Sequence, residues 1–253
     1  MFTRKICFII IMIEYVFIVP YRDRESHKYF FDRYMKYLLE DYHPSSYDII
    51  FSHQNNDQPF NRGAMKNAGF LYAKQKYSNY KDINFIFNDI DTLPYKKGLL
   101  NYKVNKNEIK HYYGFTFALG GIFSIKGSDF ENIDGFPNLW SWGYEDTVMQ
   151  ERALKNNILI NRDQFFPVFN RNILHILDEY NKNISQKNKE MYISNTIVDG
   201  LSTLKNIDFK FNNETGFLDV SNFECLYEPF DNTLTSYIGT SKQKEPLKTM
   251  KFV

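Results

Sequence analysis

The chain has 253 residues, of which 43% are hydrophobic and 24% are charged, so it can bury one large core. Its formal net charge of +1 argues against a general binder of nucleic acid or acidic polymers. The aromatic share of 18% is high, and core packing explains most of these side chains individually.

The amino terminus and the cysteines bear on the location of the protein. An apolar run from Ile6 to Ile13 follows two basic residues, as in a signal or anchor sequence. Glu14 interrupts the run, which is shorter than the ~20 residues that cross a bilayer. Cys7 and Cys225 form no disulfide framework, and two reduced thiols favour a reducing compartment. We expect a cytoplasmic protein with no clear membrane span; a membrane-anchored or lumenal location is the less favoured alternative.

The first half of the chain alternates between strands and helices. Three short apolar runs predict strands at 15–19, 47–52 and 84–88. Pro20 closes the first run, which has the continuous apolar pattern of a strand buried on both faces. Apolar residues at helical spacing predict helices over 25–40 and about 61–77. This order implies a parallel sheet with right-handed crossovers.

The second half is less regular. A polar loop is expected from Pro94 to about 111, and two short strands are expected within 112–126, around Gly120–Gly121. A tight segment from Gly135 to Gly143 leads into a helix over 144–156. Short strands and loops follow from about 158. The predicted organisation is an N-terminal extension, one catalytic domain and a C-terminal tail, at 1–14, 15–239 and 240–253.

Polar motifs follow two of the predicted strands, where parallel sheets bind their ligands. The first motif is Pro20–Tyr21–Arg22–Asp23–Arg24, whose guanidinium groups suit phosphates. The second is Asp89–Ile90–Asp91, whose carboxylates can hold a hard divalent cation against a diphosphate. Phe60–Asn61–Arg62 opens a helix, where N–H groups and a cation suit an anion. Solvated turns and an ordinary helix cap at Asn61 are the simpler alternatives.

The stretch from Gly135 to Asp146 combines two tryptophans, several glycines and two adjacent acids. Tryptophans in a Gly-flanked loop suit a flexible lid over a sugar ring. Glu145 and Asp146, at the start of the next helix, offer a general base. Buried tryptophans and an acidic first helical turn explain the residue types separately, but not their joint occurrence. His175 alone is most simply a structural histidine.

Five segments resemble, in order and spacing, blocks of the β-1,4-galactosyltransferase family. They are FIVPYRDR, FNRGAMKNAGF, FIFNDIDTLP, GGIFSIKGSDFENIDGFPNLWSWGYED and VDGLSTL, and the similarity runs from Phe17 to about Leu204. The resemblance implies an α/β nucleotide-sugar-binding fold of the GT-A type, with a mixed, mostly parallel central sheet flanked by helices. It also implies an inverting, metal-dependent transferase that moves a hexose or N-acetylhexosamine from a UDP-sugar to a hydroxyl of a saccharide acceptor.

The resemblance assigns a role to each matching position. The residues expected around the UDP-sugar are Pro20, Tyr21, Arg22, Arg24, Phe60, Arg62, Asp89, Ile90, Gly121 and Trp142. Those expected at the acceptor are Gly120, Glu145 and Asp146, with Asp146 as the catalytic base. Mn²⁺, with Mg²⁺ as an alternative, is expected on Asp91, His175 and Asn172.

The chain departs from the family pattern at several positions. Asn172 replaces a Met metal ligand, Thr147 replaces an Asp, and Ala118 replaces a Tyr that restricts the donor sugar. The paired cysteines of the family are also missing. Two alternatives therefore stay open: a chondroitin-synthase-like N-acetylgalactosaminyl transferase, and an inactive sugar-binding protein of the same fold.

Overall fold

The first half of the chain folds as its periodicity predicts. The elements are β1 (Tyr15–Tyr21), α1 (Glu25–Leu38), β2 (Tyr47–Gln54), α2 (Arg62–Lys76) and β3 (Asn84–Asn88), with a short 3₁₀ helix, η1 (Pro44–Ser46), before β2. β1 pairs in parallel with β2 on one side and with β3 on the other, which confirms the predicted parallel sheet. The structure is a computed structural model that describes residues 12–177, 180–229 and 234–239.

The central strand is buried on both faces because its side chains alternate between two hydrophobic clusters. Val16 and Ile18 belong to the cluster that α2 covers. Phe17 and Val19 belong to the cluster that contains the buried residues of α1. On α2, a Cβ at Gly69 would lie 2.7 Å from Cγ2 of Ile18, so glycine at this position lets the helix approach β1 closely.

The middle of the chain completes the mixed sheet. Its elements are β4 (Thr92–Pro94), β5 (Glu108–Gly114), β6 (Ile122–Lys126), α3 (Gly127–Asn132), α4 (Glu145–Lys155), β7 (Leu159–Asn161), β8 (Phe166–Pro167) and β9 (Ile173–His175). β6 is antiparallel to both β3 and β5. The loop predicted up to about residue 111 is wrong at its end, because β5 begins at Glu108. Pairing with β6 and β7 makes this polar segment a strand, although its sequence carries little apolar signal.

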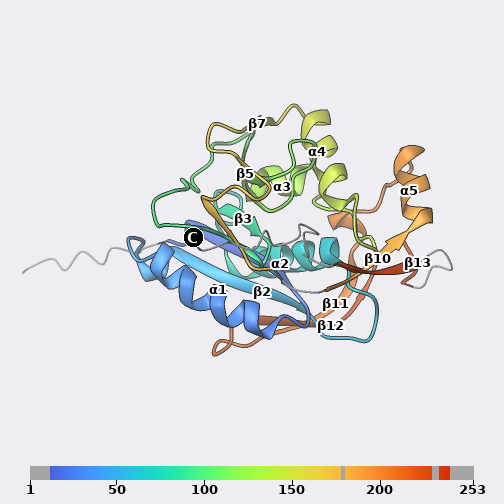
Figure 1. The fold of residues 1–253 in the computed structure, drawn as a ribbon, viewed down its shortest axis with the longest axis horizontal. Coiled ribbons are helices and arrows are strands. Elements are labelled where there is room, and N and C mark those ends of the chain that lie inside the picture. The colour runs from blue at the N-terminus through green and yellow to red at the C-terminus, as the bar shows by residue number, and fades with distance from the viewer. Residues whose placement is uncertain (1–11, 178–179, 230–233, 240–253) are drawn as a thin grey trace, which may run out of the picture.

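The C-terminal part contains elements that local patterns did not reveal. They are β10 (Tyr180–Ser185), α5 (Gln186–Ile193), η2 (Leu201–Thr203), β11 (Lys205–Phe211), β12 (Phe217–Glu224) and β13 (Leu234–Gly239). β12 lies parallel to β2, and the nine-stranded sheet therefore has the order β11–β12–β2–β1–β3–β6–β5–β7, with β8 beside β5. Figure 1 shows α5, β10 and β13 at one end of the molecule.

The ends of the chain bear on the predicted organisation and location. Residues 1–11 and 240–253, which include the expected tail and most of the expected N-terminal extension, lie outside the described residues. Glu14 takes part in the sheet: its amide donates to the carbonyl of Ser46, and its carbonyl accepts from the amide of Asn84. Within the part of the chain that the structure describes, no helix is long and apolar enough to cross a membrane.

Candidate active site

The ends of β3, α2 and α4 meet beyond the carboxyl edge of the parallel strands. β3 ends directly before Asp89, α2 begins at Arg62, and α4 begins at Glu145. The side chain of Asn61 accepts a hydrogen bond from the amide of Ala64 at 2.9 Å, so it caps α2 and fixes where Arg62 enters the site. The fold therefore brings together residues from three of the motifs that the sequence singled out.

The side chain of Arg62 contacts all three carboxylates of this arrangement. Its Nη1 lies 3.0 Å from Oε1 of Glu145, and its Nη2 lies 3.1 Å from Oδ2 of Asp89 and 2.7 Å from Oδ2 of Asp146. One guanidinium group thus holds carboxylates from two different elements in a fixed arrangement, which its planar fork of donors suits.

Lys66 is a second cation at the same point, and the sequence analysis missed it. Its side chain is 1% exposed, and its Nζ lies 2.9 Å from Oδ1 of Asp146 and 4.0 Å from Oδ1 of Asp89. The ammonium group also lies over the ring of Phe136, 4.4 Å from its centre. A signal was present in the sequence, since Lys66 stands on the buried side of α2, where the other residues, apart from Asn67, are small or apolar.

The acidic residues differ in their protonation behaviour. Burial alone would raise the pKa of Asp146, but Arg62 and Lys66 hold that pKa below its ordinary value. Burial raises the pKa of Glu145, because the attraction of Arg62 does not offset the loss of solvation. The two adjacent acids are therefore shifted in opposite directions, and the lowered pKa of Asp146 is the one that suits a general base.

A glycine pair lies against Asp146. A Cβ at Gly120 would lie 2.5 Å from Oδ2 of Asp146, so a side chain there would collide with the carboxylate. Gly121 has φ of +68°, a left-handed conformation that favours glycine, and its carbonyl accepts from the amide of Asp89 at 3.0 Å. The amide of Leu119 donates to the carbonyl of Asp146 at 2.9 Å. The 119–121 segment is thus fixed to both acidic motifs.

The side chain of His111 contacts the backbone of this glycine segment. Its Nε2 lies 3.0 Å from the carbonyl of Tyr113 and 3.1 Å from that of Gly120, and Nε of Arg162 donates to its Nδ1 at 3.1 Å. This pattern assigns the ring proton to Nε2. Burial, together with the charge of Arg162, lowers the pKa of His111 to about 4, so the ring is neutral at physiological pH.

Two of the predicted metal ligands lie at one end of the β4–β9 ladder: Asp91 directly precedes β4, and His175 is the last residue of β9. His175 pairs with Thr92, and the amide of Ile176 donates to the carbonyl of Asp91 at 2.8 Å, which brings Asp91 beside His175. Burial raises the pKa of Asp91, and the negative charge of Asp89 is the second largest cause of this rise.

Asn172 lies at the other end of the ladder. Its carbonyl accepts from the amide of Tyr95 at 2.7 Å, and its side chain is exposed. Three residues of strand place its backbone about 10 Å from that of His175. Among the described residues, no three His, Cys, Asp or Glu side chains gather closely enough to hold a metal ion.

Several buried polar atoms of the site have no hydrogen-bond partner in the described structure. They are Nε of Arg62, Oδ1 of Asp89, Oε2 of Glu145 and Nδ1 of His175. Such atoms are costly when they are left unsatisfied, and their concentration in one place is typical of a site that a ligand completes.

The residues expected after β1 are mostly engaged with the protein. Arg22 donates to the carbonyls of Gln58 and Asn56, and so holds the loop that leads into α2. Tyr21 is buried, with its ring 5.1 Å from that of His53. The other expected UDP-sugar residues in this region are the buried Pro20 and Ile90 and the partly exposed Arg24 and Phe60.

The two tryptophans of the Gly-rich segment differ, and the expectation that both belong to a flexible lid is wrong for Trp140. Its side chain is 5% exposed, stacks on Phe223 at 5.0 Å, and donates through Nε1 to the carbonyl of Tyr227 at 2.7 Å. Trp142, in contrast, is 45% exposed. Tyr144, next in the segment, stacks on Tyr192 of α5 at 4.9 Å.

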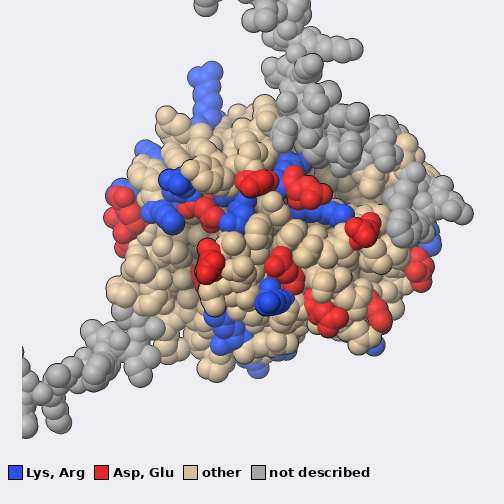
Figure 2. Space-filling model, turned by 90° about the horizontal axis from the view of Figure 1, so that it is seen from below, with Lys and Arg blue, Asp and Glu red and all other residues tan. Residues whose placement is uncertain are grey.

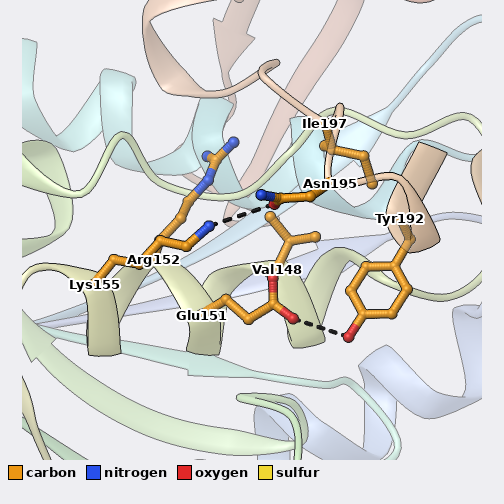
Figure 3. A pocket seen from close by; sticks show the side chains of 7 residues that line it. All are labelled: Val148, Glu151, Arg152, Lys155, Tyr192, Asn195 and Ile197. Carbon is orange, nitrogen blue, oxygen red and sulfur yellow. Dashed lines mark hydrogen bonds between the residues drawn. The ribbon is translucent and has the colours of Figure 1, made fainter.

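The described surface also carries a small pocket beside α4. A pocket of about 80 Å³ lies between α4 and the end of α5 with the segment after it. Two pairs of its lining residues are hydrogen-bonded to each other, Glu151 with Tyr192 and Lys155 with Asn195 (Figure 3), and Arg152 donates to backbone carbonyls outside the pocket. It is also much smaller than the ~300 Å³ of a typical ligand site. Figure 2 shows acidic and basic side chains interspersed on one face of the molecule.

Two family profiles match the chain in succession. The N-terminal region of glycosyl transferase group 7 matches residues 7–103, and the N-terminal domain of galactosyltransferase matches residues 101–175. β-1,4-galactosyltransferase 2 of Cricetulus griseus is 29% identical over 209 residues, 74% of this chain and 53% of that protein. Human β-1,4-galactosyltransferase 4 is 31% identical over 161 residues, 57% of this chain and 44% of that protein. The chain spans about half the length of these relatives.

Solved structures show the same architecture. The catalytic domain of Drosophila β-1,4-galactosyltransferase 7, in complex with xylobiose, superposes with a TM-score of 0.65 at 20% identity. The match covers 86% of this chain and 95% of that domain. A mutant of the same enzyme, in complex with manganese, UDP-Gal and xylobiose, gives a TM-score of 0.62 at 18% identity. The expected GT-A type fold is confirmed.

These relatives correct the expected location. The β-1,4-galactosyltransferases that the chain matches are membrane-anchored enzymes of the Golgi lumen, so the cytoplasmic expectation is wrong. It relied on the scarcity of cysteines, which is a poor guide because a domain with a core of this size needs no disulfide. Cys7 lies outside the described residues, and Cys225 is a partly buried thiol.

Proposed function

This chain belongs to the β-1,4-galactosyltransferase family, and on that basis we propose that it is an inverting, UDP-sugar-dependent glycosyltransferase. The donor sugar is a hexose or N-acetylhexosamine, and the acceptor is a hydroxyl group of a saccharide. The observation that carries the proposal is the cluster of Arg62, Asp89, Glu145 and Asp146, with its unsatisfied buried atoms.

In the proposed reaction, Asp146 is the general base. Its carboxylate takes the proton of the acceptor hydroxyl as that oxygen attacks the anomeric carbon from the side opposite the diphosphate. The bond from the anomeric carbon to the diphosphate oxygen breaks, the configuration inverts, and UDP leaves with the bonding electron pair. Because Arg62 and Lys66 keep Asp146 ionised, the base is ready before the acceptor binds.

Glu145 suits a different role from that of its neighbour. Burial raises its pKa, and its buried Oε2 has no hydrogen-bond partner in the described structure. Such a group binds and orients an acceptor hydroxyl through hydrogen bonds. Gly120 leaves room for the acceptor next to Asp146, because any side chain there would occupy the space beside Oδ2.

Asp91 and His175 would hold the divalent cation. They lie side by side across β4 and β9, and a carboxylate with an imidazole nitrogen is a suitable partial ligand set for Mn²⁺. The buried, unsatisfied Nδ1 of His175 agrees with this assignment. When bound, the cation would neutralise charge on the diphosphate. Because the protein supplies few ligands, diphosphate oxygens and water would complete the coordination shell.

The two alternatives are less well supported. An inactive sugar-binding protein has no need to keep Asp146 in contact with both Arg62 and the buried Lys66. A chondroitin-synthase-like transferase would share the Asp-x-Asp and Trp-Gly-x-Glu-Asp patterns, but the relatives that the chain matches are β-1,4-galactosyltransferases.

A donor screen tests the proposal. The purified chain is incubated with Mn²⁺, a panel of saccharide acceptors and UDP-Gal, UDP-GalNAc, UDP-Glc or UDP-GlcNAc in turn, and UDP release and product mass are measured. We expect transfer from at least one donor, with a β linkage from the α-linked UDP-sugar. Release of no UDP with any donor, by a folded protein that binds UDP, would establish a binding protein instead.

A further inference from the structure

Lys66 is an unusual residue for its position. Apart from Asn67, the other buried residues of α2 are small or apolar, and a lysine that is 1% exposed is costly unless its charge is compensated. The compensation comes from the site itself: Nζ is 2.9 Å from Oδ1 of Asp146. Lys66 is one helical turn after Arg62, so both cations project from the same face of α2 onto the same carboxylate.

The two cations hold different oxygens of Asp146. Arg62 contacts Oδ2 at 2.7 Å, and the same Nη2 also contacts Asp89, which the proposed function puts beside the UDP-sugar. Lys66 contacts Oδ1. Oδ2 is the oxygen nearest Gly120, on the side assigned to the acceptor. Each oxygen of the carboxylate therefore has its own cation: Lys66 holds Oδ1, and Arg62 holds Oδ2, the oxygen that also faces Gly120.

We propose that Lys66 is a positioning residue for the base: it anchors Oδ1 of Asp146 so that Oδ2 faces the acceptor hydroxyl. The proposal rests on the proposed function. It matters most when the donor is bound, because a diphosphate competes with the carboxylates for Arg62. Lys66 is too deeply buried to move with the donor, so it stays as the fixed partner of Asp146 in every step.

The charged groups that face Asp146 are few and identifiable. Arg62 and Lys66 come from α2, Asp89 follows β3, Glu145 precedes Asp146 on α4, and neutral His111 on β5 lies beyond Gly120. Lys66 and Arg62 supply the positive charge in this group. Removal of Lys66 should therefore leave Asp146 more basic and less well oriented, while the other groups stay in place.

The test compares Lys66→Met, which keeps length and packing, with Lys66→Arg, which keeps the charge. For Lys66→Met we expect kcat to fall about 100-fold, the cost of misplacing a reacting group by about 1 Å. The KM for the UDP-sugar should change less than about three-fold. The acid limb of the kcat/KM profile should move up by about one pH unit, because a carboxylate that loses a cationic neighbour protonates at higher pH. Lys66→Arg should keep the acid limb near its wild-type position.

The matched control is Lys74→Met, two turns further along α2. Lys74 pairs with Glu131 outside the site, and its removal should leave kcat and the pH profile unchanged. A carbon-13 NMR titration of the Asp146 carboxyl, assigned with Asp146→Asn, gives a readout that needs no turnover. Its midpoint should rise in Lys66→Met.

Three results would overturn the proposal. The first is an unchanged kcat and acid limb in Lys66→Met. The second is an equal pH profile in the Met and Arg variants, and the third is activity loss that only follows a lowered melting temperature. A wild-type chain that transfers no sugar would overturn the proposed function instead, and the NMR midpoint would then still report whether Lys66 holds Asp146.

Discussion

The residues on the proposed acceptor side of the site and those on the proposed metal side differ in how many contacts hold them in place. On the acceptor side, Asp146 contacts Arg62, Lys66 and the backbone of Leu119, and Gly120 packs against it. On the proposed metal side, a backbone hydrogen bond from the amide of Ile176 to the carbonyl of Asp91 brings Asp91 beside His175, and Nδ1 of His175 has no hydrogen-bond partner in the described structure. The carboxylate proposed as the base is thus held by several side-chain and backbone contacts, whereas the proposed metal ligands make fewer contacts with the rest of the site.

This difference follows from the chemistry proposed for each side. A base must be oriented before the reaction, and preorganised charges cost no rearrangement at that moment. A cation that also binds a diphosphate receives part of its shell from the substrate, so the protein needs to supply only a few ligands. Variants on the acceptor side should therefore affect turnover, and variants on the metal side should affect the binding of cation and donor.

The largest effect is expected from Asp146→Asn. Loss of a general base typically costs ~10²–10⁴-fold in rate, and the amide keeps the size of the side chain. We expect kcat to fall by that amount, while UDP binding, measured by calorimetry, stays near wild type. Glu151→Gln is the control, because Glu151 lies further along α4 and its carboxylate accepts a hydrogen bond from the hydroxyl of Tyr192. Turnover within a few-fold of wild type in Asp146→Asn would remove Asp146 from the mechanism.

The choice of donor sugar should depend on the size of the side chain at position 118. Ala118 is buried, and it stands where the resemblance expects a tyrosine that restricts the donor sugar. We expect the wild-type chain to use an N-acetylhexosamine donor at least as well as galactose. Ala118→Tyr should shift the ratio of the two kcat/KM values toward galactose by about 10–100-fold, the range over which pocket size discriminates.

The outcome that contradicts this prediction is strict use of galactose by the wild-type chain. Leu119, the buried neighbour, would then be the residue that fills the space, and Leu119→Ala would be the variant that relaxes the choice.

The two tryptophans provide a matched pair. Trp142→Ala should weaken acceptor use by about 10-fold with little change in UDP binding or melting temperature, because removal of an exposed stacking face costs about 1.5 kcal/mol. Trp140→Ala should instead lower the free energy of unfolding by about 3–5 kcal/mol, as expected for a buried aromatic residue. Steady-state kinetics and chemical denaturation measure the two effects. Equal loss of acceptor and UDP binding in Trp142→Ala, together with lower stability, would show a structural role.

The smallest effect is expected from substitutions of Asn172, which test whether its side chain is a ligand of the divalent cation. If its amide oxygen contributes to the cation site, Mg²⁺ should support an appreciable share of the Mn²⁺ rate, because amide oxygen suits the harder ion. Asn172→Ala should then weaken the apparent affinity for Mg²⁺ a few-fold, and Asn172→Met should lower the Mg²⁺ activity selectively. Unchanged affinity for both ions in Asn172→Ala would leave Asp91 and His175 as the protein ligands, in agreement with the exposed position of Asn172.

The sequence by itself determined the first half of the fold and the position of its motifs. Apolar runs and helical spacing are local signals, so β1, α1, β2, α2 and β3 could be predicted to within a few residues. The parallel order then placed Asp89 at the carboxyl edge of the sheet, because strand direction fixes which end meets the ligand.

Only the tertiary structure decided which partners these residues meet. The contacts of Lys66 and Arg62 with Asp146 join residues 80 and 84 positions apart, and no local pattern encodes such a distance. The same holds for β12, which is a strand of the main sheet because it pairs with β2, far earlier in the chain. Burial likewise separated Trp140 from Trp142, since neighbouring tryptophans carry the same sequence signal and differ only in what packs against them.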